Sequence, residues 1–208
     1  MNKEVNFKAS LLLIVFAAVV FMAVGYAAYT RTVTIKPSAS VSPSASDFNV
    51  HLSSAQTSDS TTAVTPSKSP TTITAGNATL SSTTISGMSA TFTAPGQSVT
   101  YTFYARNTGK YKAYLKSITY ASSFKTCTAK SGTTQSLVNS ACNGISVSTT
   151  VGSESAVTAS KTFSNHTLAK GGNEKITVVI SYASGSAQAD GDFTVTFKDI
   201  SLLYSSAA

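Results

Sequence analysis

The chain has 208 residues, enough for a targeting segment and one domain with a packed core. Only 11% of the residues are charged, less than half of the usual share, and the net charge of +7 reflects scarce acids. Nucleic-acid binders cluster basic residues among stacking aromatics, so this composition argues against a nucleic-acid partner. A weakly cationic surface suits anionic wall polymers or glycans, or simply keeps the protein soluble.

An apolar run near the N-terminus predicts that the chain is exported. Residues 9–29 read ASLLLIVFAAVVFMAVGYAAY, which as a helix is long enough to cross a bilayer. Residues 1–29 are therefore predicted to be a signal peptide or a membrane anchor helix. The small residues Ala23, Gly25, Ala27 and Ala28 favour cleavage near 25–28, whereas a retained helix would hold the protein in the membrane. Prepilin-type cleavage after Lys8 is a third alternative.

The segment 30–46 is predicted to be an N-terminal strand followed by a linker. Val33 and Ile35 alternate with threonines, which is typical of a strand with one buried face. Pro37 ends this strand. The Ser-rich sequence that follows resembles a short linker.

The remaining residues, 47–208, are predicted to form an all-β domain. Alternation of apolar and polar residues is regular in three segments, 47–53, 98–106 and 175–182. Less regular strands are expected at 78–85, 88–93, 113–121, 144–151 and 192–204. Residues 53–70 are polar and are predicted to be a surface loop. Eight or nine short strands without a convincing helix indicate a jelly-roll or immunoglobulin-like β-sandwich after the N-terminal hydrophobic helix.

The last predicted strand changes its apolar face. Apolar residues occupy odd positions from 193 to 197 and even positions from 200 to 204. A continuous flat strand cannot bury both sets on one side. We therefore predict either a bulge near 198–200 or a strand that crosses between sheets.

Cys127 and Cys142 are the only cysteines, and an even pair outside the cell predicts a disulfide. The bond would order the Ser/Gly-rich segment between two strands. Asn77 and Asn165 each begin an Asn-X-Thr sequence that fits the N-glycosylation signal, but the sequence leaves their modification open.

The exported part offers few groups for catalysis or for a metal. No HExxH or GxSxG motif is present. His51 lies on the polar face of a predicted strand, and His166 lies in a predicted loop. Asp190 and Asp192 flank a glycine, but calcium needs six or more oxygens and a turn is the simpler explanation. We predict that the protein is not an enzyme and needs no cofactor or metal.

Several segments together resemble a known family of exported proteins. The core segment PGQSVTYTFYARNTGK resembles a pattern widespread in exported bacterial and archaeal β-sandwich modules. With GYAAYTRTVTI, SDFNVHL and LAKGGNEKITVVISY in the same order, the chain is similar to the camelysin/TasA-like exported fibre and biofilm-matrix proteins. The resemblance implies a jelly-roll subunit whose N-terminal strand completes the sheet of the next copy.

Our first functional hypothesis is therefore a subunit of an extracellular fibre or matrix. Arg31, Val33 and Ile35 are the candidate donor-strand residues, and the partners are other copies of the chain, arranged head to tail. The same segment could equally be the first strand of its own sandwich.

The alternative is a monomeric, membrane-anchored surface module that binds cell-wall polymer, glycan or another cell. Its candidate surface is a cationic aromatic patch of seven residues. A plainer interpretation is that these are exposed strand residues whose charges block pairing between sheets. Both hypotheses place the protein outside the cell or at its surface. The patch comprises Tyr104, Arg106, Lys110, Tyr111, Lys112, Tyr114 and Lys116.

Overall fold

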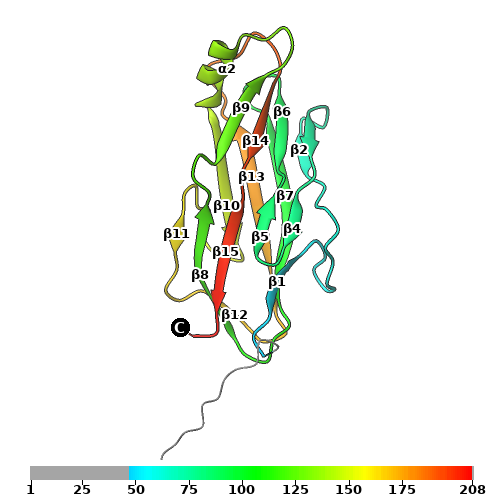
Figure 1. Ribbon diagram of the computed structural model, residues 1–208, viewed down its shortest axis with the longest axis vertical. Helices are drawn as coiled ribbons and strands as arrows, with labels where there is room; N and C mark the ends of the chain where they lie inside the picture. The colour runs from blue at the N-terminus through cyan, green and yellow to red at the C-terminus, as the bar shows by residue number, and fades with distance from the viewer. Residues whose placement is uncertain (1–46, 208) are drawn as a thin grey trace, which may run out of the picture. The chain divides into compact units, whose positions relative to one another are not determined.

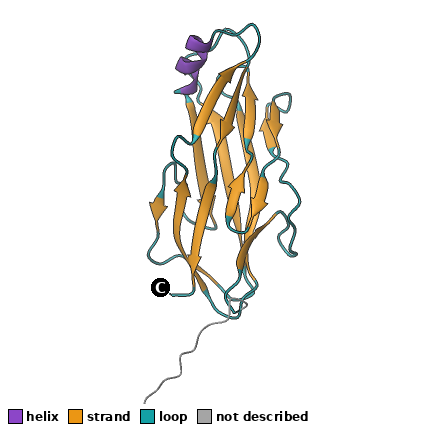
Figure 2. Ribbon diagram, viewed as in Figure 1, coloured by secondary structure: helices purple, strands orange, loops and turns teal. Residues whose placement is uncertain are grey.

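The computed structural model describes residues 47–207. They form an all-β, sandwich-like fold of antiparallel sheets (Figures 1 and 2). The predicted helix at 9–29 and the predicted strand and linker at 30–46 lie outside the described residues. Within the described range, no helix is long and apolar enough to cross a membrane.

The first layer is one sheet built around the two longest strands. β7 (Ser98–Asn107) and β13 (Asn173–Tyr182) pair along almost their whole length, which confirms the strands predicted at 98–106 and 175–182. The order across this sheet is β1–β7–β13–β10, and β2 also pairs with β7. The flanking strands are β1 (Val50–Ser53), β2 (Ser67–Ser69) and β10 (Ile145–Val151).

The second layer consists of two shorter sheets that follow one another along the strand direction (Figure 1). One has the order β3–β6–β14–β9, with β3 (Thr74–Gly76), β6 (Ser89–Phe92), β14 (Phe193–Phe197) and β9 (Lys125–Ala129). The other has the order β11–β8–β15–β5–β4, and β12 also pairs with β8. Its strands are β11 (Lys161–Thr162), β8 (Ala113–Tyr120), β15 (Ile200–Ser205), β5 (Thr84–Ser86), β4 (Thr79–Ser81) and β12 (Thr167–Leu168).

Alternating burial explains why the long strands form where they do. In β7 every second residue, from Val99 to Asn107, is buried, and the residues between are half-exposed. The inward row of β13 runs from Ile176 to Tyr182 and meets the inward rows of β14 and β15. The aromatic rings of Phe92, Tyr182 and Phe193 pack edge-on or tilted at centroid distances of 5.6–6.2 Å.

The change of face in the last strand marks the boundary between the two sheets of the second layer. β14 ends at Phe197, and the chain resumes as β15 at Ile200 in the neighbouring sheet. At the crossing, Lys198 N–H donates to the Phe124 carbonyl (2.8 Å), and Asp199 accepts from Ala121 N–H (3.1 Å). Both apolar sets are therefore buried, as predicted for a strand that crosses between sheets.

The short elements were not predicted. The structure has fifteen strands among residues 47–207, not eight or nine, and β2 lies within the predicted loop at 53–70. The predicted strand at 78–85 is divided into β4 and β5. Strands of two or three residues are too short to show a period-two pattern in the sequence. They adopt the extended conformation because they pair with a neighbouring strand.

The expectation of a domain without a helix was wrong. α2 (Gln135–Cys142) follows β9 and buries Val138 and Ala141, spaced three residues apart on one face. Asp190 accepts from Thr134 N–H (2.9 Å), so its carboxylate serves the helix N-terminus from a distant loop. The turn that was expected at Asp190 thus also supports a helix.

The disulfide prediction is confirmed, and the bond fastens α2 beside β9. Cys127 in β9 is joined to Cys142 at the end of the helix, with the Cα atoms 6.1 Å apart. At the other end of α2, Gln135 accepts from Ala129 N–H (2.9 Å) and donates to the Cys127 carbonyl (3.1 Å). The Gln135 amide thereby occupies the place that a neighbouring strand would take on β9.

Loss of the disulfide should destabilise the domain by about 3 kcal/mol, because the bond closes a loop of about 15 residues. Denaturant unfolding of Cys127→Ser/Cys142→Ser, with and without a reducing agent, measures the effect. The reduced wild-type protein should match the double variant, and Gln135→Ala should lose less. A wild-type midpoint that does not respond to reduction would contradict this.

Candidate functional site

A buried histidine lies between two glutamates at one end of the sandwich. His166 Nδ1 is 2.9 Å from Glu154 Oε1, and Nε2 is 2.6 Å from Glu174 Oε2. The side chains of His166 and Glu174 are only 8% and 9% exposed. The Tyr204 hydroxyl donates to the other oxygen of Glu174 at 2.7 Å. We call these four residues the imidazole cluster.

The cluster joins elements from both layers. Glu174 continues the inward row of β13, and Tyr204 belongs to the inward row of β15. His166 stands directly before β12, and Glu154 lies in the loop after β10. Each long strand therefore contributes a polar side chain where its apolar row ends.

Gly152 lets the chain pass close to the cluster. Its φ of +54° lies in the left-handed region, where a side chain is strained, and an added Cβ would lie 2.9 Å from Glu174 Oε2. A side chain at the point where the chain leaves β10 would therefore strain the backbone and displace the Glu174 carboxylate.

The geometry favours a charged imidazole. An ionised carboxylate only accepts hydrogen bonds, so two carboxylates are satisfied together only when both ring nitrogens carry hydrogen. Burial lowers the pKa of His166, but the hydrogen bonds and negative charges of Glu154 and Glu174 outweigh it and raise the pKa above the ordinary 6.5. Burial, with the neighbouring Glu174, also raises the pKa of Tyr204 well above 10.0.

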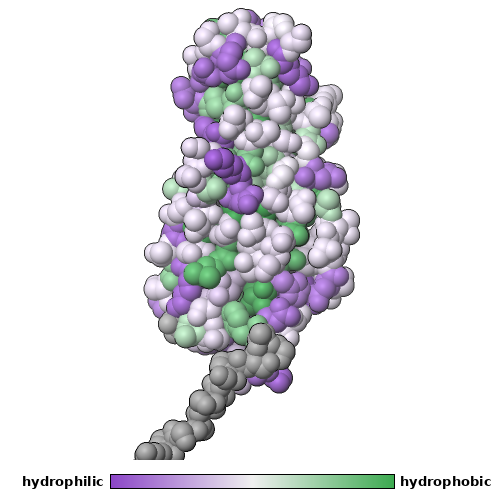
Figure 3. Space-filling view, viewed as in Figure 1, coloured by the Kyte–Doolittle hydropathy of each residue, from purple (hydrophilic) through white to green (hydrophobic). Residues whose placement is uncertain are grey.

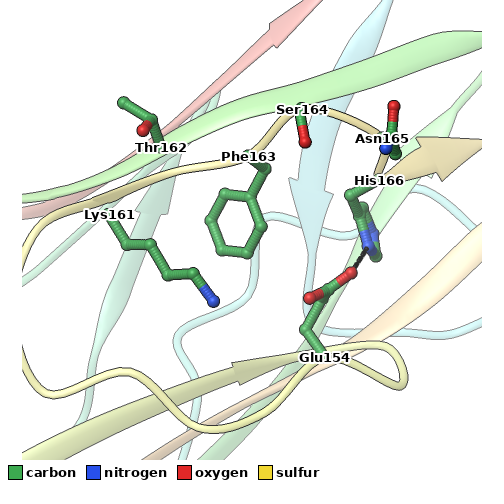
Figure 4. Close-up of a pocket in the computed structure, with 7 residues that line it drawn as sticks. All are labelled: Glu154, Lys161, Thr162, Phe163, Ser164, Asn165 and His166. Atoms are coloured by element: carbon green, nitrogen blue, oxygen red, sulfur yellow. Dashed lines mark hydrogen bonds and ion pairs between the residues drawn. The ribbon is translucent and has the colours of Figure 1, made fainter.

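A shallow pocket of about 290 Å³ adjoins the cluster (Figure 4). Lys161 Nζ lies 4.9 Å from the centre of the Phe163 ring, a cation–π distance. In Figure 4 the Glu154 carboxylate extends toward the His166 ring, where the dashed line marks their hydrogen bond. Asn165, whose sequence fits a glycosylation signal, is exposed at the rim.

The cluster can hold a charge and fix three chain segments, but its histidine has no free nitrogen. A general base needs an available lone pair. Both nitrogens of His166 face carboxylate oxygens within hydrogen-bond distance. The arrangement is therefore better suited to structural control than to proton transfer.

Sequence reasoning placed His166 in a loop and missed the cluster. One signal was available, because Glu174 has the same parity as Ile176, Val178 and Ile180 and therefore belongs to the inward row. An acid in such a row needs a buried partner. Glu154 and His166 come from irregular segments between β10 and β13, Tyr204 comes from β15, and no local pattern identifies them as partners.

The other histidine belongs to a more exposed ion pair. His51 Nε2 lies 2.8 Å from Asp59 Oδ1, and the Arg106 guanidinium contacts the same carboxylate oxygen. These partners hold the pKa of Asp59 below its ordinary 3.8. Among residues 47–207, no three His, Cys, Asp or Glu side chains are grouped in a way that could hold a metal ion.

The seven residues of the predicted cationic aromatic patch fall into separate groups. Tyr104 and Arg106 lie on the outward face of β7 in the first layer. In the second layer, the ammonium groups of Lys112 and Lys116 lie 4.9 Å and 5.7 Å from the centre of the Tyr114 ring.

The loop between β7 and β8 carries the other two residues of the patch, Lys110 and Tyr111. Lys110 pairs with Asp47 at 2.6 Å, and Tyr111 is 48% exposed. The structure thus brings together Lys112, Tyr114 and Lys116, but not all seven residues. Cys127 and Cys142 form the disulfide described above, and the candidate donor residues Arg31, Val33 and Ile35 lie outside the described residues.

The face seen in Figure 3 is mostly of intermediate hydropathy, with small separate hydrophilic and hydrophobic areas. Leu203, on β15, is 58% exposed. Such scattered apolar residues are normal on a protein surface. Leu203 alone is therefore no sign of a docking surface on this face.

The outer edge of β10 has an open position. On the side away from β13, Thr149 exchanges two backbone hydrogen bonds with Val157 (2.8 and 2.9 Å). Backbone N–H and C=O groups of alternate residues in an antiparallel strand face the same edge, so those of Val147 also point away from β13, while its side chain is buried in the core. Within the described range, its backbone has no partner there. At Ile145 the carbonyl is held by Lys125 Nζ at 2.5 Å.

A groove of about 380 Å³ lies beside this open position. It is lined by residues 123–125, 145–147 and Thr158. Phe124, Ile145 and Val147 give it an apolar component, and the backbone of Val147 adds a donor and an acceptor. Such a combination suits an extended peptide with small apolar side chains.

Comparisons with known proteins give no relative for this chain. No family model, no curated protein and no solved structure matches it.

The cluster predicts that His166 titrates above 6.5 in the folded protein. The stability that it supplies should be complete below 6.5 and should be lost as the pH rises through the raised value. Glu174→Gln should lower the His166 pKa, because it removes a negative charge at 2.6 Å. An NMR titration measures this, and His51→Gln assigns the second imidazole. A His166 pKa at or below 6.5 contradicts the interpretation.

Proposed function

We propose that the protein is an exported structural subunit of an extracellular fibre or matrix, and that it assembles by β-strand addition between copies. The observation that carries the proposal is the open ladder position at Val147, beside a partly apolar groove. A period-two segment at residues 30–36 supplies a strand of the kind that such an edge accepts.

The β10 edge and the segment at residues 30–36 are chemically complementary. Backbone hydrogen bonds along the β10 edge would give affinity, and the Val33 and Ile35 side chains would enter the apolar groove and set the register. A head-to-tail contact that does not close on itself grows into a filament. In this scheme the partners are other copies of the chain, and no catalytic step or cofactor takes part.

Location outside the cell follows from the apolar run at residues 9–29 and is compatible with the disulfide. Disulfides persist in oxidising compartments and are rare in the cytosol. The Cys127–Cys142 bond therefore weakly supports an extracellular location. Whether the protein is released or anchored depends on cleavage of the apolar run.

We also propose that the sandwich is of the jelly-roll type, as the family resemblance implies. Support comes from the chain path, because β7, β10 and β13 belong to the first layer, whereas β8, β9, β14 and β15 belong to the second. The last strands of the second layer pair with β5 and β6, near the start of the domain. This Greek-key winding also occurs in immunoglobulin-like sandwiches.

A monomeric, membrane-anchored binding module is the second candidate. Lys112 and Lys116 flank the Tyr114 ring and form a small cationic aromatic group. A ring flanked by ammonium groups can stack on a sugar and pair with an anionic wall polymer. This function would need a single copy and no strand exchange.

Deletion of residues 30–36 should convert polymers of the exported protein into monomers, because the donor strand is lost. Sedimentation and electron microscopy of the surface product measure this. Val33→Asp/Ile35→Asp should act like the deletion, whereas Thr32→Asp/Thr34→Asp, on the opposite row, is the matched control and should still assemble. Polymers that survive the deletion would exclude strand addition. The second candidate would be favoured if the wild type is a monomer that binds anionic polymer and if the Lys112→Ala/Lys116→Ala variant does not bind it.

A further inference from the structure

A strap formed by residues 152–168 covers one side of the sandwich. It leaves β10 at Gly152 and pairs with the outer side of β10 through Val157. It then crosses to the second layer, where β11 and β12 pair with the outer edge of β8. The strap therefore covers an edge of each layer.

Few apolar contacts hold the strap. Between Gly152 and Leu168, only Val157 and Leu168 are buried hydrophobic residues, and Phe163 is half-buried. β11 and β12 have two residues each. Segments with so little buried surface open at low free-energy cost. A strong polar contact along the strap would therefore decide how often it opens.

The imidazole cluster is the charged contact of the strap, whose other side-chain hydrogen bonds join neutral groups, from the Tyr120 hydroxyl to the Val157 carbonyl (2.9 Å) and from Tyr120 N–H to Ser160 Oγ (3.0 Å). Glu154 and His166 both belong to the strap, whereas Glu174 and Tyr204 belong to the long strands beneath it. The His166–Glu174 bond at 2.6 Å fastens the strap to β13, and the His166–Glu154 bond at 2.9 Å fastens its two ends to each other. Charge-assisted hydrogen bonds of this kind are the strong ones.

We propose that the strap is a pH-gated cover, closed while His166 carries its proton and released when the proton is lost. A neutral imidazole has one N–H and can donate to only one of the two glutamates. The nitrogen without hydrogen then faces a carboxylate, and the two negative charges of Glu154 and Glu174 lose the cation between them. The proton passes to solvent water or hydroxide, the N–H is the only covalent bond of the protein that is broken, and the hydrogen bond that it made to a carboxylate is lost.

The groups that face His166 all favour this direction of switching. They are Glu154 in the strap itself, Glu174 from β13 and, through Glu174, the Tyr204 phenol from β15. Lys161, farther along the strap, lines the same pocket and is the one cation besides the His166 imidazolium among its lining residues. Its ammonium lies over the Phe163 ring. Proton loss therefore leaves the carboxylates with less compensation.

Release would enlarge an interaction surface. With the strap closed, the outward ladder of β10 is open at Val147, whereas Thr149 is bonded to Val157. With the strap open, Thr149 and the edge of β8 that pairs with β11 and β12 also become free. The surface suits an extended strand, and in our proposal its occupant is a strand of a second copy of the chain. This last step rests on the proposed function, but the gate itself does not.

Hydrogen exchange measured by mass spectrometry on the full chain tests the gate. After correction for intrinsic rates, strap peptides should exchange on the order of tenfold faster at about pH 9 than at about pH 5. Peptides of β7, in the centre of the first sheet, are the internal reference and should not change. Equal corrected protection of the strap at both pH values overturns the proposal.

Two variants separate the gate from a general loss of stability. Glu154→Gln changes a part-exposed side chain and should lower the pH at which the strap opens. His166→Gln cannot be charged, so its strap should be poorly protected at both pH values. His51→Gln is the matched control and should retain the wild-type pH dependence. If strap protection still depends on pH in His166→Gln, or no longer depends on pH in His51→Gln, the switch belongs to another group and the proposal is overturned.

The consequence for assembly is measured separately, by sedimentation of the wild type and His166→Gln at about pH 5. The variant should assemble faster, because its edges are uncovered without proton loss. Faster exchange without faster assembly would retain the gate and exclude a second copy as the occupant.

Discussion

The ladder between β7 and β13 is the constraint on which the other parts depend. These two strands pair residue by residue from Ser98–Ser181 to Arg106–Asn173, and their inward rows form the floor of the core. Because a strand has two edges, a long central pair leaves the protein with two outer edges to manage. β1 and β2 share one outer edge of β7, and β10 covers the outer edge of β13. β10 then becomes the new edge.

Side chains complete several of these edges where no strand does. The Gln135 amide pairs with the backbone of β9, and Lys125 holds the carbonyl at the start of β10. Ser160 Oγ accepts from Tyr120 N–H at 3.0 Å on β8. A side chain can be released by rotation or by a change in protonation, whereas a ladder must be unzipped. Edges closed in this way are protected from non-specific pairing but can still be opened to a partner.

The long elements could be predicted from the sequence because period two persists in them for eight residues or more. The parity change at 198–200 was also visible in the sequence; it predicted either a bulge or a crossing between sheets, and the structure shows the crossing. α2 could not be predicted, because QSLVNSAC has no charged residue and little helix propensity. Its stability comes from Cys142, from Gln135 and from Asp190, which lies more than fifty residues away. The imidazole cluster likewise depends on segments that only the fold brings together, namely the strap, β13 and β15, and only the parity of Glu174 pointed to it.

The choice of residues in the cluster is hard to explain by stability alone. Buried ion pairs often contribute no more than apolar residues of similar volume, because desolvation offsets their attraction. At the end of the β13 row a leucine would continue the apolar core, yet Glu174 stands there with Tyr204 and His166. The chain has eight acids and two histidines, so two acids and a histidine at one contact represent a quarter of the acids and half of the histidines. An apolar contact would hold the strap equally well at every pH, whereas this contact strengthens only while the imidazole is charged. The distinguishing property of the cluster is therefore its dependence on protonation, which is the property that the proposed pH-gated strap requires.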